Sequence, residues 1–137
     1  MTDEIKCNWK GGMAFGVEVN DHEITIDAVE QFGGKDRGPQ PKPLLLVSLG
    51  GCTAMDVVSL LKKMRVDFED ISVNVSGELT DEHPKYFKKI HVTYIIKGDN
   101  VDTAKVEKAV ILSQDRYCGV SAMLVKVSDL THEIKYV

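Results

Sequence analysis

The sequence has few cysteines and few aromatic residues. Of 137 residues, three are cysteines and 7% are aromatic. Cys7, Cys52 and Cys118 form no CxxC pair, and their number and spacing exclude the disulfide framework that staples small secreted domains. A chain of this length buries about 65–70% of its unfolded surface and forms a core without such staples. We therefore expect reduced thiols.

The sequence also lacks an excess of positive charge and a long uninterrupted apolar run. A net charge of −4 argues against nucleic acid as the main partner. Polar residues, including Asp56, interrupt the apolar stretch 44–61, which indicates a core helix and no membrane span. The acidic N-terminal segment differs from a secretory signal. We expect a cytoplasmic protein that binds neither nucleic acid nor a membrane.

Residue patterns predict an α+β fold in one domain, 1–137. Period-2 alternation predicts a meander of three strands, which with a loop rich in glycine and proline fills residues 1–40. The part 41–137 is expected to contain a long helix, a hairpin, a second and a short helix, and a last strand. Asp99 or Asn100 is expected to cap the second helix. The expected strands are 4–9, 14–19, 23–29, 70–79, 86–97 and 131–137, and the expected helices are 43–65, 101–117 and 121–125.

The long helix has unusual surroundings. Its first turns are apolar on every side, so a large core or another chain must enclose them. Gly50 and Gly51 together cost on the order of 1–2 kcal/mol in a helix interior, which indicates that a helix or a ligand comes close there. An apolar pocket around these glycines and Met55 is one possible binding site.

Cys52 and Cys118 are candidates for thiol chemistry. Cys52 lies inside the long helix, and Cys118 lies at a predicted helix break, where a thiol becomes reachable. If their Cα atoms come within about 7 Å, the two form a dithiol site. The alternative is that both are inert core residues, as many free cysteines are. Asp56, one turn beyond Cys52, is expected to raise its pKa, and the strand position of Cys7 suggests packing.

Two segments carry a family resemblance. The sequence GPQPKPLLLVSLGGCTAMD at 38–56, followed by YCGVSA at 117–122, resembles the OsmC/Ohr family of thiol-dependent hydroperoxide reductases, and most closely its YhfA-like branch. The similarity extends over essentially the whole chain. It implies the OsmC-like fold and an intertwined homodimer whose central helices pack together.

The resemblance also implies roles for the two cysteines. Cys52 is expected to attack an organic hydroperoxide and become a sulfenic acid, which Cys118 resolves as a disulfide. A dithiol then reduces that disulfide, and no cofactor is expected. By resemblance, an arginine in the glycine turn after the first strand stabilises the family's thiolate, and a glutamate at the start of the cysteine helix holds that arginine. Met13 and Pro43 occupy the corresponding positions here, so Arg37 is the candidate replacement.

Other interpretations remain open. The chain is a possible thiol peroxidase, a non-catalytic dimer that binds a small hydrophobic molecule, or a stress-related scaffold whose cysteines only pack. No metal site is predicted, because the four histidines show no ligand spacing. Ser121 is expected to cap the short helix or to hydrogen-bond to a thiol.

Overall fold

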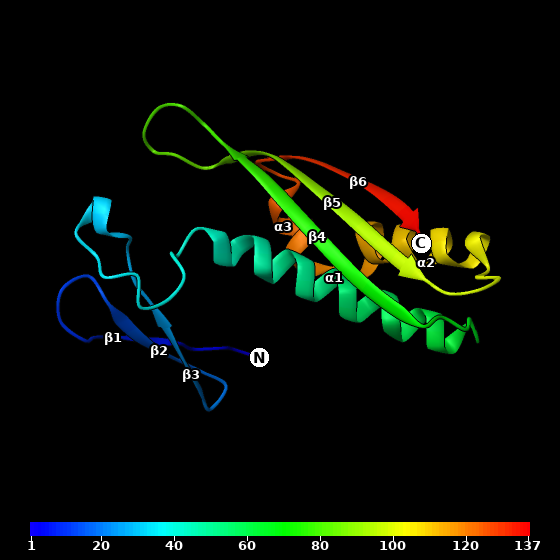
Figure 1. Cartoon of the computed structure of the whole chain (residues 1–137), viewed down its shortest axis with the longest axis horizontal. Helices are drawn as coiled ribbons and strands as arrows, with labels where there is room; N and C mark the ends of the chain where they lie inside the picture. The colour runs from blue at the N-terminus through cyan, green and yellow to red at the C-terminus, as the bar shows by residue number, and fades with distance from the viewer. The chain divides into compact units, whose positions relative to one another are not determined.

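A computed structural model describes all 137 residues, which form two compact units, Met1–Leu45 and Leu46–Val137. Figure 1 shows the order of the elements along the chain. This is the α+β class predicted from the sequence. The strands are β1 Lys6–Trp9, β2 Phe15–Val19, β3 His22–Ile26, β4 Asp70–Leu79, β5 Phe87–Lys97 and β6 Asp129–Tyr136; the helical elements are η1 Glu30–Phe32, α1 Pro43–Lys63, α2 Thr103–Leu112, η2 Ser113–Tyr117 and α3 Gly119–Leu124.

The N-terminal unit contains the predicted three-stranded meander. Its strands pair antiparallel in the order β1-β2-β3. Asn20 (φ 48°) and Asp21 (φ 62°) form the tight turn between β2 and β3, in the left-handed conformation that such hairpin turns require. Gly11 (φ 89°) and Gly12 (φ 58°) also have positive φ and lie in the turn between β1 and β2. Cys7 is exposed on β1, so the packing role expected for it is wrong for this chain.

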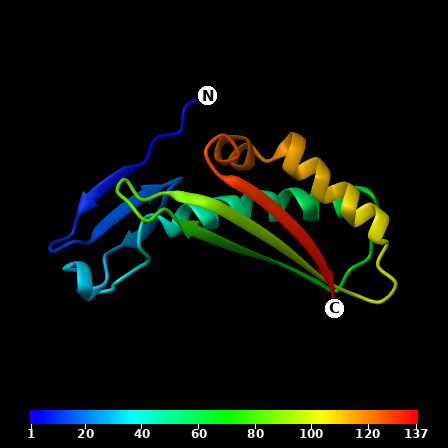
Figure 2. The same cartoon turned by 90° about the horizontal axis from the view of Figure 1, so that it is seen from above.

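The C-terminal unit is a three-stranded sheet with helices on one face (Figure 2). β4 and β5 form the predicted antiparallel hairpin, and β6 pairs parallel to β5. Parallel neighbours need a crossover connection, and α2, η2 and α3 supply it.

The core lies between that sheet and the helices. One face of β5 is fully buried, and α1 contributes a stripe of buried residues at every fourth position. Gly50 allows α1 to approach the sheet closely, because a Cβ atom there would lie 3.1 Å from Val75 Cγ2. The buried residues are Leu49, Thr53, Val57 and Leu61 of α1, Ile90, Val92, Tyr94 and Ile96 of β5, and Val106, Ala109 and Val110 of α2.

Helix α1 is enclosed only in part. Val47 is 64% exposed and Met55 75% exposed, so the core of this chain covers one side of the helix. Of the two ways of enclosing the first turns that the sequence predicts, a large core does not do so, and enclosure by another chain stays a prediction. By length and composition the helix is also able to cross a membrane. Its most apolar 18 residues have a mean hydropathy of 1.9, and 22% of them are buried. This is weak evidence of a span, because the core helix of a soluble protein meets the same criteria.

Two helix boundaries differ from the prediction. Asp102 caps α2, because its carboxylate accepts from the backbone N–H of Lys105 at 3.2 Å. The predicted caps, Asp99 and Asn100, lie before this residue and do not cap the helix. The second helix ends as an α-helix at Leu112 and continues as one π-helical turn, η2. The sequence pattern does not distinguish these two kinds of turn, because both are continuous helical backbone.

Candidate functional site

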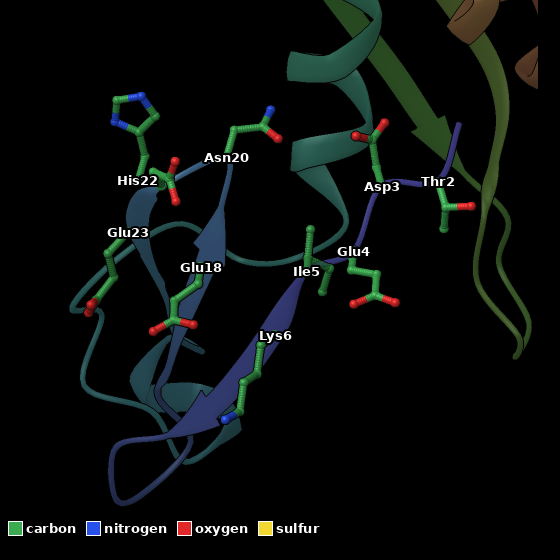
Figure 3. Close-up of a pocket in the computed structure, with 10 residues that line it drawn as sticks. Thr2, Asp3, Glu4, Ile5, Lys6, Glu18, Asn20, His22 and Glu23 are labelled. Carbon is green, nitrogen blue, oxygen red and sulfur yellow. The ribbon is translucent and has the colours of Figure 1, made fainter.

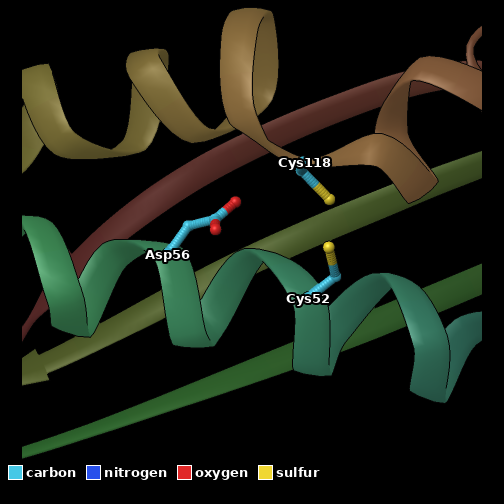
Figure 4. Close-up of side chains that lie close together, drawn as sticks. All are labelled: Cys52, Asp56 and Cys118. Atoms are coloured by element: carbon cyan, nitrogen blue, oxygen red, sulfur yellow. The ribbon is translucent and has the colours of Figure 1, made fainter. Parts of the chain in front are cut away.

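The crossover brings Cys118 to Cys52 of α1. Their Sγ atoms and a carboxylate oxygen of Asp56 all lie within 4.8 Å of one another. Figure 4 shows the two sulfur atoms pointing toward each other from facing elements, with the Asp56 side chain beside them. Both cysteines are free thiols. The structure therefore places the predicted thiol pair together.

The π-helical turn positions Cys118. The Cys118 backbone N–H donates to the Ser113 carbonyl at 2.8 Å, a bond over five residues that closes the turn. Cys118 itself is extended (φ −77°, ψ 102°) and caps α3, its Sγ accepting from the Ser121 N–H at 3.4 Å. Ser121 is therefore not the cap expected from the sequence. Cys118 is only 3% exposed, so the expectation that the helix break makes this thiol reachable is wrong in the isolated chain.

A chain of hydrogen bonds runs beside the thiol pair. Ser113 donates to Asp56 Oδ2 at 3.0 Å, and Thr53 Oγ1 lies 2.7 Å from Ser113 Oγ and 2.6 Å from the Tyr94 hydroxyl. Gln114 Nε2 donates to Tyr94 at 2.6 Å. No buried side-chain polar atom lacks a partner.

The two ends of this chain fix its direction. The Gln114 amide only donates at one end, and the Asp56 carboxylate, when ionised, only accepts at the other. The Tyr94 hydroxyl therefore donates to Thr53, and Thr53 donates to Ser113. Hydrogen bonds that all run in one direction polarise and strengthen one another, so this chain holds the Asp56 carboxylate in a fixed orientation.

The surroundings of Cys52 favour its neutral thiol. Burial raises the pKa of Cys52 above its usual value of 9.0, and Cys118 and Asp56 raise it further, while the backbone of Val120 lowers it. The effect expected of Asp56 is confirmed. None of these groups is a cation, so a thiolate at Cys52 needs a positive charge from elsewhere.

Arg37 is held in place within the N-terminal unit. Its Nε donates to Asp27 Oδ2 at 3.1 Å, and its Nη2 donates to the Gly11 carbonyl at 3.1 Å. A Cβ atom on Gly12 would lie 3.5 Å from Nη2. The guanidinium therefore lies at the glycine turn after β1, where the family resemblance places an arginine and where this sequence has Met13. The Asp27 side chain that accepts from Arg37 Nε is fully buried.

Gly51 and Met55 lie on the exposed side of α1. No atom lies within 4 Å of the place where a Gly51 Cβ would be. An apolar groove of about 540 Å³ lies alongside, lined by Ala54, Met55, Val58, Ser59, Lys62 and Ile71.

Two larger cavities lie elsewhere on the chain. The cavity of about 760 Å³ in the N-terminal unit is lined by several carboxylates, including Glu4, Glu18 and Glu23, and by no cysteine (Figure 3). The cavity of about 650 Å³ in the C-terminal unit is lined in part by Cys118, Arg116 and His132. The second cavity therefore reaches Cys118, and Cys52 does not line it.

Comparison with known proteins decides the family. The family model described as "OsmC: OsmC-like protein" matches residues 33–133 of this chain. This chain belongs to the OsmC family. It is 35% identical over 135 residues to protein YhfA of Escherichia coli K12, covering 98% of each chain.

Solved structures show the same fold. A hypothetical protein from Aquifex aeolicus superposes with a TM-score of 0.85 and 32% identity, covering 100% of this chain and 98% of that one. A Legionella pneumophila organic hydroperoxide resistance protein OsmC, described as a predicted redox protein, superposes with a TM-score of 0.74 and 18% identity, covering 98% and 97%. The OsmC-like fold with a neighbouring cysteine pair is thus established, and the resemblance predicted from the sequence is confirmed.

Sequence reasoning missed most of the polar residues behind the cysteines. Thr53 carried a usable signal, because it is the one polar residue in the buried stripe of α1. Ser113 follows the buried positions of α2 in the same way. Tyr94 and Gln114 carried none, since their contacts depend on how the sheet and the π-helical turn meet.

Proposed function

We propose that this chain is a thiol-dependent organic hydroperoxide reductase that uses Cys52 and Cys118. The observation that carries the proposal is the approach of two reduced cysteines, 66 residues apart in sequence, to within 4.8 Å. Cys52 is the attacking thiol, because it is partly exposed while Cys118 is buried.

The reaction has two steps. The Cys52 thiolate attacks the O–O bond of the hydroperoxide and takes one oxygen, and the released alkoxide takes a proton to give an alcohol. Cys118 then attacks the sulfenic acid, the S–S bond forms, and water leaves. The Sγ atoms need to close by only about 3 Å to reach the S–S bond length of about 2.05 Å. An external dithiol then attacks at the partly exposed Cys52, restores both thiols and is itself oxidised to a disulfide.

Arg37 supplies the positive charge in this proposal. Its guanidinium has five N–H donors. One donates to the Asp27 carboxylate and one to the Gly11 carbonyl. The remaining donors are free to stabilise an anion. By resemblance, peroxidatic relatives have their arginine in this glycine turn. Arg37 would bring a guanidinium to the same turn from a different position in the sequence.

The active form is proposed to be a homodimer. The exposed apolar face of α1 includes Val47 and Met55, and exposed apolar patches mark association sites. Gly51, between them, allows a second helix to approach closely. The cytoplasmic location remains a prediction from the sequence.

Intact-mass analysis tests the chemistry. The reduced protein is treated with a small excess of cumene hydroperoxide and then mapped by peptide mass spectrometry. We expect a loss of two hydrogen atoms per chain and a Cys52–Cys118 cross-link. Cys7→Ser is the matched control and should give the same result, whereas Cys118→Ser should stop at the sulfenic acid.

The same measurement separates the alternatives. A chain that keeps all three thiols after treatment is not a peroxidase. In that case native mass spectrometry of freshly purified protein would show whether a small hydrophobic molecule is bound, and an empty chain would leave the scaffold role.

A further inference from the structure

We propose that Cys52, Asp56 and Cys118 form a zinc-binding site in the reduced protein. Two thiols and one carboxylate offer ligand atoms that all lie within 4.8 Å of one another. Sequence spacing hides this set, because one cysteine comes from the crossover and no histidine is involved.

The backbone already places the three ligands. Cys52 and Asp56 are four residues apart on α1 and therefore share one face of the helix. Tetrahedral zinc has bonds of about 2.3 Å to sulfur and about 2.0–2.2 Å to carboxylate oxygen, so its ligand atoms lie about 3.5–3.8 Å apart. Starting from 4.8 Å or less, the site closes with a movement of about 1 Å.

The charges favour a divalent cation. All three groups are anionic when deprotonated, and the carboxylate of Asp56 forms no ion pair in the chain, its hydrogen-bond donor being the neutral Ser113 hydroxyl. A cation between the three groups offsets their mutual repulsion. Thiolate ligands select zinc over magnesium and calcium, which prefer oxygen.

Hydrogen bonds beyond the ligands support the same site. Metal-binding carboxylates are commonly held by a further hydrogen bond, and the loss of such partners weakens binding. The Ser113 hydroxyl donates to Asp56 Oδ2 and is itself fixed by Thr53. The Ser121 N–H donates to the Cys118 sulfur.

Binding is a balanced exchange of protons for metal. Zinc displaces one proton from each of the two thiols, and the Asp56 carboxylate binds without releasing one. Three protein ligands leave a fourth tetrahedral position for water. The Cys52–Cys118 disulfide of the proposed function would remove both sulfur ligands, so zinc binding and oxidation of the two cysteines exclude each other. Only this consequence rests on the proposed function.

Metal titration of the full-length reduced chain, under anaerobic conditions, tests the site. Cobalt(II) is the spectroscopic probe, and zinc is titrated against a chromophoric chelator. We expect one metal per chain, a thiolate-to-cobalt charge-transfer band, and release of two protons measured by calorimetry in buffers of different ionisation enthalpy. These measurements on the unaltered chain do not depend on the folding of a variant.

Variants then locate the ligands. Cys52→Ser and Cys118→Ser should each abolish the charge-transfer band, and Asp56→Asn should weaken zinc binding by at least about tenfold. Cys7→Ser and Asp81→Asn, at exposed positions, should bind as the unaltered chain does. Absence of the band, or a band that survives loss of either cysteine, overturns the proposal. Cumene hydroperoxide treatment of metal-free protein is a separate readout, so failure of one proposal does not imply failure of the other.

Discussion

The hydroxyl of Thr53 lies 2.6 Å from the hydroxyl of Tyr94, and neither residue has any exposed surface. This contact joins α1 to β5 inside the core, directly behind the cysteine pair. Because Thr53 also contacts Ser113 at 2.7 Å, one side chain connects the central helix to both the sheet and the π-helical turn. The position of Cys118 thus depends on a polar contact in an otherwise apolar layer.

Replacement of Thr53 by valine tests that dependence. The shape is kept, but two hydrogen bonds are lost and the buried Tyr94 and Ser113 hydroxyls each lose a partner. We expect the free energy of unfolding to fall by about 1–3 kcal/mol, measured by urea denaturation at fixed protein concentration. Thr93→Val, on the opposite face of β5, is the control and should change stability by less than about 0.5 kcal/mol. An equal effect of the two substitutions would contradict a structural role for the chain of hydrogen bonds.

Asp56 is expected to slow the reactions of the Cys52 thiol. Burial, Cys118 and Asp56 all raise the pKa of this thiol above 9.0. Asp56→Asn removes one negative charge, so the pKa should fall and iodoacetamide should alkylate Cys52 faster at pH 8, as followed by peptide mass spectrometry. The exposed Asp81→Asn variant should match the unaltered chain. A slower or unchanged rate in Asp56→Asn would show that the carboxylate does not act on the thiol.

Much of the fold was predictable because its signals are local. Alternation of apolar residues located β4 within its observed bounds, and the run of helix-compatible residues from Pro43 located α1 to within two residues at its end. The parallel pairing of β5 with β6 was not predicted, because it depends on the path of the crossover and not on either strand's own pattern.

The site was predictable only in part for the same reason. Cys52 and Cys118 were found by resemblance and by their positions in helices, and the effect of Asp56 followed from its spacing on one helix. The location of the Arg37 guanidinium at the Gly11 carbonyl required the structure, since the two residues are 26 positions apart.

Asp27 should make the N-terminal unit sensitive to acid. Burial alone raises the pKa of Asp27, but hydrogen bonds from the backbones of Ala28, Arg37 and Lys35 and from the Arg37 side chain outweigh it and hold the pKa below 3.8. A lowered carboxyl pKa stabilises the folded state above about pH 3.8, and this contribution disappears as the pH falls through the folded-state pKa.

Hydrogen exchange checks the prediction for Asp27. As the pH is lowered below about 3.8, the amides of Lys35 and Arg37 should lose protection relative to their intrinsic exchange rates. Asp27→Asn should show weak protection of both amides already at pH 7, with little further loss in acid. Asp3→Asn is the matched control at an exposed position, and it should retain the acid dependence. Protection that does not respond to Asp27→Asn would be incompatible with this role.

Gly51→Ala tests the proposed dimer. In the isolated chain the new methyl group meets no atom within 4 Å, and alanine in place of glycine favours the helix by about 0.5–1 kcal/mol. If a second copy packs on this face, the methyl group should weaken association by on the order of tenfold, measured by sedimentation as a function of concentration. Gly119→Ala, which also adds a methyl group in open space, should leave association unchanged. Unaltered or tighter association of Gly51→Ala would place the interface elsewhere.

Arg37 is expected to set the rate of hydroperoxide reduction. Each unit by which a cation lowers a thiol pKa raises the thiolate fraction about tenfold near neutral pH, so Arg37→Gln should slow disulfide formation by at least about tenfold. Its pH profile should shift to higher pH, which a purely structural defect would not produce. Lys42→Gln removes an equal charge from the same glycine- and proline-rich loop and should react at the normal rate. Stopped-flow measurements with cumene hydroperoxide distinguish these outcomes, and an Arg37→Gln variant with the normal rate and pH profile would mean that another cation, or no cation, serves Cys52.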